Sequence, residues 1–287
     1  MVPHIRPAME ADANEVGRIM HDAFRGVAEA HGFHPDLESV EEAANVAAMF
    51  IASPTIFGVV AEHDGQIIGS NFLAEGDPVR TVVTLTIEPR FQGRGVGRML
   101  MEAVLERARS AASVRLVADA FNIRSVPLYA SMGFEVKEPL LLMRGTPQSG
   151  TSSGYVTRPL SADDVAACEK LAKKVYGTVR TSELQDAVKL FKPFVAEKDR
   201  KICAYLSSAG LWLANHGIAE TEADMRALIA GTSALTGEPI SFLLPVRQAS
   251  LFQWCICEGF RVVKPMLLMS KGEYVEPNGV WFPSVSY

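Results

Sequence analysis

Three glycines alternate with other residues in the segment 92–97, which joins a run of β-branched residues to an amphipathic run. Glycines at this spacing let successive backbone amides converge on one point. The first turn of a helix adds amides that lack an intrahelical partner and favour an anion. Arg94 and Arg98 place positive charge on the same segment. These residue types predict a binding site for a phosphate-like anion.

Two familiar phosphate loops do not fit this segment. A Walker loop needs Gly-Lys followed by Ser or Thr, whereas here the sequence runs Gly97-Arg98-Met99. A dinucleotide-binding fingerprint that starts at Gly95 needs a small residue five positions later, and that position holds Leu100. The anion therefore belongs to another class of ligand.

The pattern Gln-x-x-Gly-x-Gly at 92–97, after the strand end at 87–89, resembles the coenzyme A pyrophosphate loop of the GNAT acyltransferase superfamily. Downstream, Asn122, Tyr129 and the Gly-Phe pair at 133–134 follow in the order found in that superfamily's next segment. Strand, loop, helix and strand occur together and in sequence. The first half of the chain is thereby identified as a member of this superfamily.

The resemblance implies an acetyl-CoA cleft where the strand 79–87 diverges from the strand 114–118. A peptide-like pantetheine arm can pair with the exposed backbone of the first strand, while the glycine loop holds the pyrophosphate. The residues that the resemblance assigns to the cofactor are Leu85, Thr86, Ile87, Gln92, Gly93, Arg94, Gly95, Val96, Gly97, Arg98, Asn122 and Tyr129.

Tyr129 is the candidate general acid. When an amine attacks the thioester, a thiolate must leave, and a phenol with a pKa of about 10 can protonate a thiolate whose acid has a pKa of about 8.5. The general base is less clear, because the strand before the loop carries no Asp, Glu or His. Glu88 is the favoured candidate, with Glu75, His63 or a chain of waters as alternatives.

The acceptor side is expected between the first two helices, a segment that borders the acceptor site in this superfamily. The substrate-binding candidates there are Phe24, His31, Phe33 and His34. Two histidines three residues apart suggest a metal, but no third ligand stands at a persuasive spacing. We expect no metal site.

The two halves of the chain are copies of one internal duplication. Arg6-Pro7 before an acidic helix start matches Arg158-Pro159, and the segment 133–143 matches 259–269 without a gap. The offset falls from 152 at the start to 126 at the end, so the second copy is 26 residues shorter. We therefore expect an α/β protein made of two tandem GNAT folds, each a mixed, largely antiparallel twisted sheet flanked by helices.

The expected boundaries are a catalytic domain over 1–145, a linker over 146–154 rich in Gly, Ser and Thr, and a degenerate domain over 155–287. In the second copy the loop is matched to 213–220, which lacks the paired glycines. The offset of 126 replaces Asn122 by Gln248 and Tyr129 by Cys255. Only the first copy is therefore expected to bind the cofactor.

Secondary structure is predicted from periodicity in both copies. Strands are expected at 4–8, 56–61, 66–73, 79–87, 114–118, 194–197, 201–206, 211–214 and 240–244, and helices after residue 10, at 40–51 and after the glycine loop. The Asp-Gly pair at 64–65 predicts a hairpin.

Composition excludes several classes of protein. The net charge is −5, with 28 basic and 33 acidic residues, so nucleic acid is not an expected partner. No apolar stretch suits a membrane, and four cysteines are too few for a disulfide scaffold, so we expect a cytoplasmic protein. Cys255 and Cys257 are expected to be buried. A monomer or weak homodimer is expected.

The favoured function is an acetyl-CoA-dependent N-acetyltransferase that transfers the acetyl group directly to a primary amine of a small molecule. A protein or peptide amine is the alternative acceptor. A third hypothesis is a non-catalytic acyl-CoA sensor, because the strand before the loop lacks a carboxylate.

Overall fold

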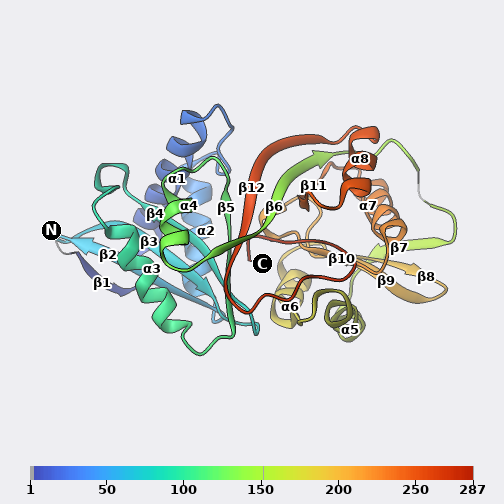
Figure 1. Cartoon of the computed structure of the whole chain (residues 1–287), viewed down its shortest axis with the longest axis horizontal. Helices are drawn as coiled ribbons and strands as arrows, with labels where there is room; N and C mark the ends of the chain where they lie inside the picture. Colours follow the sequence, from blue (N-terminus) through green and yellow to red (C-terminus); the bar gives the residue numbers. More distant parts are fainter. Residues whose placement is uncertain (1–2, 151, 287) are drawn as a thin grey trace. The chain divides into compact units, whose positions relative to one another are not determined.

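The computed structural model describes residues 3–150 and 152–286. The chain forms two compact units (Figure 1). Unit 1 comprises Met1–Val114 and Phe121–Met132, and unit 2 comprises Arg115–Ala120 and Gly133–Tyr287. The compact units therefore do not separate at the expected linker, because the chain passes into unit 2 twice.

Unit 1 contains a four-stranded antiparallel sheet in the order β1-β2-β3-β4. Its strands are β1 (His4–Pro7), β2 (Ile56–His63), β3 (Gln66–Ala74) and β4 (Arg80–Ile87). Its helices are α1 (Ala13–Ala30), α2 (Val40–Ala52), α3 (Val96–Arg107) and α4 (Ser125–Ser131), with short 3-10 turns η1 (Glu10–Asp12) and η2 (Pro89–Phe91).

Helices cover both faces of this sheet. Residues 68–73 of β3 are all buried, which is typical of a strand covered on both sides. The Asn71 amide donates to the carbonyl of Leu100 in α3, at 3.3 Å. The adjacent Phe72 packs against Phe50 of α2, with ring centroids 5.5 Å apart. Successive side chains point to opposite faces, so α2 and α3 lie on opposite sides of β3.

The predicted hairpin is confirmed. Asp64 and Gly65 both have positive φ, 50° and 75°, as a two-residue turn matched to the strand twist requires. The turn joins β2 to β3, whose register runs from Ile56 opposite Ala74 to His63 opposite Gln66. Strand β3 pairs in turn with β4, and Gly69 lies opposite Ile87, the last residue of β4.

The predicted duplication appears as the same ion-pair network in each unit. In unit 1, Arg6 donates to both carboxylate oxygens of Asp12 at 2.7 and 3.0 Å, and its Nε donates to Glu62 at 2.9 Å. In unit 2, Arg158 donates to Asp164 at 2.7 and 2.8 Å. Its partner on the neighbouring strand is Glu197. Each network joins a first strand to the start of the following helix.

Unit 2 contains two groups of strands. One sheet has the order β13-β10-β9-β8-β7, and the other runs β5-β12-β6-β11. The strands are β5 (Ser113–Asp119, whose first two residues are in unit 1), β6 (Glu135–Gly145), β7 (Tyr155–Pro159), β8 (Phe194–Lys198), β9 (Lys201–Leu206), β10 (Gly217–Ala219), β11 (Ile240–Pro245), β12 (Arg261–Gly272) and β13 (Val280–Phe282). The helices are α5 (Val165–Tyr176), α6 (Thr181–Leu190), α7 (Glu222–Thr236) and α8 (Ala249–Cys257), with turns η3 (Ala162–Asp164) and η4 (Trp212–Ala214).

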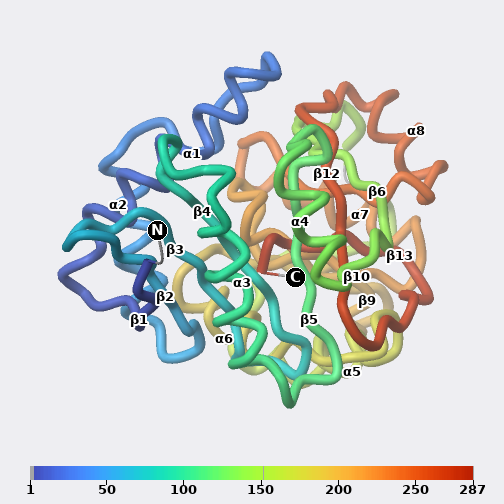
Figure 2. The backbone as a smooth tube through the Cα atoms, turned by 60° about the vertical axis from the view of Figure 1, so that its left-hand side comes forward, coloured from blue at the N-terminus to red at the C-terminus, as the bar shows by residue number. Residues whose placement is uncertain are grey.

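Strand β6 explains why the units do not divide at residue 145. It pairs antiparallel with β12 on one side and with β11 on the other, although both come from the second half of the sequence. Figure 2 shows β6 and β12 running side by side. The duplicated segments 133–143 and 259–269 therefore pair with each other.

Three sequence expectations for the second copy are wrong. Leu211–Ala214 is not a strand, because Trp212–Ala214 forms the 3-10 turn η4. The segment 213–220, which the sequence matched to the glycine loop, is not a loop before a helix, because it includes part of η4 and the whole of β10. The loop between β10 and α7 consists of residues 220–221 alone. Cys257 is exposed, whereas Cys255 is buried as expected.

Within residues 3–150 and 152–286, no helix is long and apolar enough to cross a membrane.

The paired ion networks predict acid sensitivity. Hydrogen bonds from Arg6 and Arg158 hold the pKa values of Asp12 and Asp164 below their usual range. A depressed carboxyl pKa stabilises the fold above the unfolded value of about 3.9, and this stabilisation is lost as the pH falls through the folded value. Melting curves from pH 7 to 2 should show Tm of the wild type falling below about pH 4.

The double variant Asp12→Asn/Asp164→Asn should melt about 5 to 10 °C lower than the wild type at pH 7. Its Tm should change less between pH 4 and 2, because the two titrating groups are gone. Asp163→Asn, at an exposed neighbouring position, is the control. An equal acid dependence in the double variant and the wild type would contradict this assignment.

Candidate functional site

The connection from β4 to α3 forms an open backbone cradle at a helix start. Gly93 and Gly95 have φ of 73° and 85°, which side-chain-bearing residues rarely adopt. Gly95 is the N-cap of α3, and no side chain among the described residues caps it. A Cβ at Gly93 or Gly95 would meet no described atom within 4 Å. The first amides of α3 are therefore left for a ligand or water.

The cradle is tied to the end of β4 and to the start of α4. The Gln92 amide donates to the carbonyl of Ile87 at 3.2 Å, and its side-chain oxygen accepts from Arg124 at 2.9 Å. Arg98, in the first turn of α3, donates to Ser131 of α4 at 2.6 Å. These bonds give the cradle a defined shape.

Gly97 lets β4, α3 and α4 meet. A Cβ at Gly97 would lie 3.4 Å from Leu128 of α4 and 3.8 Å from Leu85 of β4. Three segments that the sequence assigned to the cofactor therefore converge on one point of unit 1. Gly97 lies within the helix, so it serves close packing, whereas Gly93 and Gly95 serve backbone conformation.

Asn122 organises the start of α4. Its side-chain oxygen accepts from the backbone amides of Arg124 and Ser125 at 3.3 and 3.1 Å. Its amide nitrogen is therefore the group that remains to donate to a ligand. Tyr129 lies on the same helix and is 8% exposed. A phenol mostly removed from water is suited to deliver its proton to a bound reactant.

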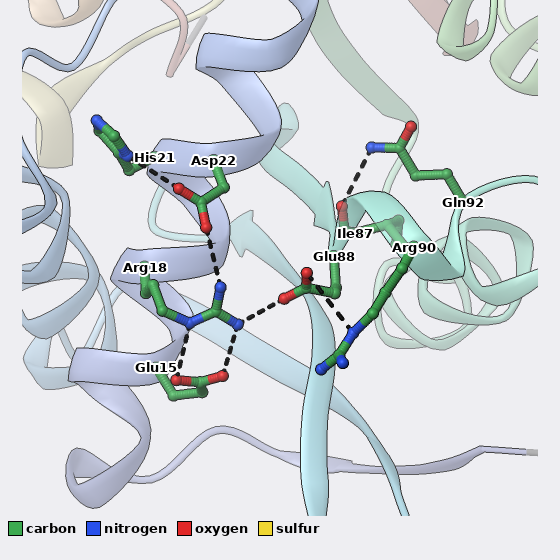
Figure 3. Close-up of polar contacts among 8 residues, drawn as sticks. All are labelled: Glu15, Arg18, His21, Asp22, Ile87, Glu88, Arg90 and Gln92. Carbon is green, nitrogen blue, oxygen red and sulfur yellow. Dashed lines mark hydrogen bonds and ion pairs between the residues drawn. The ribbon is translucent and has the colours of Figure 1, made fainter.

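Glu88 follows β4 and belongs to a charged network centred on Arg18 (Figure 3). Arg18 donates to Glu88 Oε2 at 2.5 Å, to Glu15 at 2.7 and 3.1 Å, and to Asp22 at 2.9 Å. Glu88 Oε1 lies 3.8 Å from Arg90 Nε, beyond hydrogen-bond distance. The Glu88 side chain is only 12% exposed, so Arg18 compensates a largely desolvated carboxylate.

The ion pairs also shift the pKa values of the network. The hydrogen bonds that Arg18 donates to the Glu15 and Glu88 carboxylates raise the pKa of Arg18. The Arg18 guanidinium in turn lowers the pKa of Glu15. Arg18 therefore stays charged across the whole working range of pH.

The network lines an open groove of about 730 Å³ in unit 1. Its walls come from the start of α1, the β2–β3 hairpin and the residues just after β4. The lining residues are Arg6, Asp12, Glu15, Arg18, Gly65, Gln66, Ile67, Glu88 and Arg90. The lining side chains that carry charge pair with one another, which favours a polar, solvated groove.

The expected acceptor segment contacts the chain just before Asn122. Phe33 stacks on Phe121 with ring centroids 4.3 Å apart and an interplanar angle of 18°. The His31 ring lies 5.2 Å from Phe121. Phe24 is half-buried on α1, and His34 is exposed in the connection to α2. The structure thus brings two of the four predicted acceptor residues to the asparagine loop.

The two alternative bases have partners of their own. Glu75 accepts from Arg107 at 2.7 and 2.9 Å, and hydrogen bonding from Arg107 lowers its pKa. The His63 ring lies 6.1 Å from Phe91, whose face also carries Arg90 and Arg94 at 5.3 and 5.6 Å. In the part of the chain that the structure describes, no three His, Cys, Asp or Glu residues form a metal-binding group.

Three residues of this region were missed by sequence reasoning. Arg18 reaches Glu88 from 70 positions away, and Phe121 and Arg124 flank Asn122. A basic residue at 124 and an aromatic residue beside the asparagine were visible in the sequence. Their partners were not, because stacking and ion pairing across long loops leave no periodic signal.

A comparison with protein families matches residues 18–134 to the family described as "Acetyltransferase (GNAT) family". Among curated proteins, the chain is 35% identical over 98 residues to mycothiol acetyltransferase of Nocardiopsis dassonvillei, covering 33% of this chain and 30% of that protein. It is 28% identical over 112 residues to glucosamine 6-phosphate N-acetyltransferase of Trypanosoma brucei brucei, covering 36% and 75%. The chain spans less than a third of the length of the Nocardiopsis relative that it matches.

Solved structures show that the likeness of fold extends over both halves. A putative acetyltransferase from Pyrococcus horikoshii has a TM-score of 0.74 at 14% identity, covering 96% of this chain and 91% of that one. A tandem GNAT protein from the clavulanic acid biosynthesis pathway has a TM-score of 0.59 at 14% identity, covering 96% and 99%. The tandem fold expected from the sequence is therefore confirmed.

The Arg18 network predicts a specific pattern of destabilisation. Arg18→Ala leaves the carboxylates of Glu15, Asp22 and Glu88 without their shared cation, and should lower Tm by about 3 to 6 °C at pH 7. The deficit should shrink below about pH 4.5, because the lowered pKa of Glu15 stabilises the fold only above its unfolded value.

Arg25→Ala, which removes a single exposed ion pair with Glu29, is the matched control and should change Tm by less than about 1 °C. Differential scanning calorimetry at several pH values measures both. A deficit in Arg18→Ala that is constant from pH 7 to 3 would contradict the electrostatic account.

Proposed function

The chain carries a GNAT acetyltransferase domain over residues 18–134, and we propose that it transfers an acetyl group from acetyl-CoA directly to a primary amine of a small molecule. GNAT acetyltransferases use acetyl-CoA as donor. The observation that carries the proposal is the uncapped start of α3 behind Gly93 and Gly95. Backbone amides at such a position favour a pyrophosphate.

The cradle fits a cofactor of this kind on three counts. The positive φ of Gly93 and Gly95 leaves no Cβ in the way of phosphate oxygens. Arg94 and Arg98 are exposed at the same helix start and add charge. Leu85–Ile87 is the proposed backbone partner of a peptide-like arm, and the side-chain amide of Asn122, whose oxygen accepts from Arg124 and Ser125, is the proposed donor. Val96 is buried beneath the cradle and anchors α3.

Acetyl-CoA, when bound, supplies an acetyl group already activated as a thioester. Tyr129 holds on its Oη the proton that a departing thiolate requires. The Tyr129 residue is largely buried, at 8% exposed. The convergence of Leu128 and Leu85 at Gly97 positions α4 against the end of β4. Tyr129 is therefore the proposed general acid.

Glu88 is the proposed general base for the incoming ammonium group. Its Oε1 lies beyond hydrogen-bond distance of Arg90 and is the oxygen proposed to accept a proton, directly or through one water. Its Oε2 is held by Arg18, which fixes the carboxylate after β4. Arg18 is a positioning residue in this scheme.

A small-molecule acceptor is supported by the relatives named as mycothiol and glucosamine 6-phosphate acetyltransferases. The stacked pair Phe33–Phe121, with His31 beside it, offers an aromatic surface next to Asn122. Such a surface suits the apolar face of a small amine substrate. Phe24 and His34 remain proposed contacts of the same acceptor.

Replacing the proposed acid and base should separate their effects. Tyr129→Phe should lower kcat by about 10²-fold or more with little change in acetyl-CoA affinity, since a general acid acts on the chemical step. Glu88→Gln should lower kcat/KM, because it removes the carboxylate proposed to accept the proton of the amine. The assay is release of the coenzyme A thiol across a panel of small amines and amino-terminal peptides.

Full turnover by Tyr129→Phe in an active preparation would remove Tyr129 from the mechanism. Acetyl-CoA binding without transfer to any amine would favour the acyl-CoA sensor instead. Faster turnover of peptides than of small amines would favour a protein acceptor.

Cofactor binding is proposed to reside in unit 1 alone, at one molecule per chain. Gly95→Glu should abolish binding, because it forces a side chain into a left-handed backbone conformation and adds a negative charge beside two phosphates. Gly26→Glu adds the same charge on α1, where a Cβ meets no described atom within 4 Å. Titration calorimetry of the Gly26 control should give an unchanged affinity.

A stoichiometry near two in the wild type would show that the second copy also binds. Retained affinity in folded Gly95→Glu protein would place the cofactor elsewhere.

A further inference from the structure

The last strand of the chain fills the edge of a sheet in unit 2. Strand β13 pairs antiparallel with β10, with Gly217 opposite Phe282 and Ala219 opposite Val280. It is the end strand of the β13-β10-β9-β8-β7 sheet, and it also contacts β11, which belongs to the other group of strands. Figure 2 shows β13 beside β10. The segment 280–282 thus lies between β10, with which it pairs, and β11, which belongs to the other sheet.

A side-chain amide holds the backbone of this strand from the other side. Gln248 donates through Nε2 to the carbonyl of Trp281 at 2.5 Å, and its Oε1 accepts from the amide of Trp281 at 3.3 Å. One primary amide thereby satisfies both backbone groups of one residue, as a neighbouring strand would. Gln248 stands at the position that corresponds to Asn122 in the first copy.

The side chains of the segment are buried in fitted positions. Trp281 and Phe282 are each 1% exposed. Phe282 stacks on Phe242 of β11 with centroids 4.7 Å apart, and Trp281 packs edge-on against Tyr176 of α5 at 5.1 Å. A Cβ at Gly217 would lie 2.2 Å from the Phe282 ring. Only glycine leaves room for that ring.

Residues on either side of β13 are also anchored. The amide of Asn278 donates to the carbonyl of Val175 at 2.6 Å, and the amide of Val285 donates to Leu213 at 2.8 Å. Ser284 donates to Glu183 at 2.7 Å. The preceding residues 273–277 have no regular secondary structure and form the loop that joins β12 to this segment.

We propose that the gap between β10 and β11 is a binding site for an extended peptide strand, and that its occupant is the C-terminal segment 278–286 of this chain. The site recognises the peptide backbone through β10 and Gln248. It recognises the Phe282 ring through Gly217 and Phe242, and the Trp281 ring through Tyr176.

The duplication also relates this site to the cofactor site of the first copy, an inference that rests on the function proposed above. Strand β10 precedes α7 as β4 precedes α3, and Gln248 replaces Asn122. The C-terminal segment therefore takes the place in the second copy that the pantetheine arm is proposed to take in the first. The start of α7 agrees with this, because Thr221 and Asp224 cap it with their own side chains.

The site can be tested by separating the occupant from its receptor. A specific protease site inserted between Val275 and Glu276, both exposed, allows the folded full chain to be cleaved before the segment. A fluorescent peptide with the sequence of residues 278–286 should then bind the cleaved protein saturably in an anisotropy assay. It should not bind the uncleaved chain, whose own segment is present at high effective concentration. Absence of saturable binding to the cleaved protein would overturn the proposal.

Matched variants locate the peptide in the gap. Gly217→Ala should weaken the peptide by about tenfold or more, because its methyl group overlaps the Phe282 ring. Gly210→Ala, whose Cβ would have its nearest described neighbour at 3.9 Å, should leave affinity within about twofold. Equal affinity in both variants would overturn the assignment to this gap.

Hydrogen exchange on the uncleaved chain gives a test that does not depend on the cleaved form staying folded. The amides of Trp281 and Phe282 should exchange faster in Gln248→Ala than in Gln253→Ala, an exposed position on the same helix. Equal protection in the two variants would count against the proposal. Acetyl-CoA titration reads unit 1 separately, so failure of the cofactor proposal leaves these peptide measurements unaffected.

Discussion

The backbone amides at the start of α3 need partners from outside the helix, and the arrangement of unit 1 follows from that need. Gly95 ends the preceding loop in a left-handed conformation and caps the helix without a side chain. The cradle keeps its shape because Gln92 is tied to the end of β4 and to Arg124. Gly97 then allows Leu128 of α4 to approach α3 closely, since a Cβ there would lie 3.4 Å from that side chain. If a Ser or Asp stood at the N-cap of α3, its side-chain oxygen would accept from those amides, and they would no longer be available to a ligand.

The second copy shows the alternative solution. Thr221 and Asp224 form a capping box at the start of α7, and the connection from β10 has shrunk to two residues. A helix whose first amides are satisfied by its own side chains has little to offer an anion. In this copy, side-chain oxygens satisfy amides at the helix start that the first copy leaves without a side-chain cap.

Much of the architecture was predictable because local chemistry determines it. The Asp64-Gly65 turn, the alternating β-branched runs and the repeat of Arg-Pro before an acidic helix are read directly from residue types. The pairing of β6 with β12 was not predictable, although the two segments match in sequence. Sequence similarity between copies shows that both are strands. It does not show whether each pairs within its own copy or with its counterpart.

The candidate site divides in the same way. The glycine loop, Asn122 and Tyr129 follow one another in a spacing that the resemblance could use, and the structure brings the loop and α4 together. The ion pair between Arg18 and Glu88 joins α1 to the residue after β4, and no local sequence pattern predicts it. The mistaken strand at 211–214 has a similar cause, since Leu-Trp-Leu-Ala reads as an apolar strand but forms a 3-10 turn.

In unit 2 the segment 280–282 pairs with β10 and contacts β11, in the place that corresponds to the one proposed for a ligand arm in unit 1. Parting strands leave backbone groups that must be paired, and a ligand arm or a peptide segment can pair them equally well. In unit 2 the peptide segment is part of the same chain, so it loses its conformational entropy when the unit folds and is present at high effective concentration. Phe282 and Gly217 are then coupled, because the ring fits only where the strand lacks a side chain. A segment anchored in this way, with Trp281 and Phe282 each 1% exposed, favours a rigid end to unit 2.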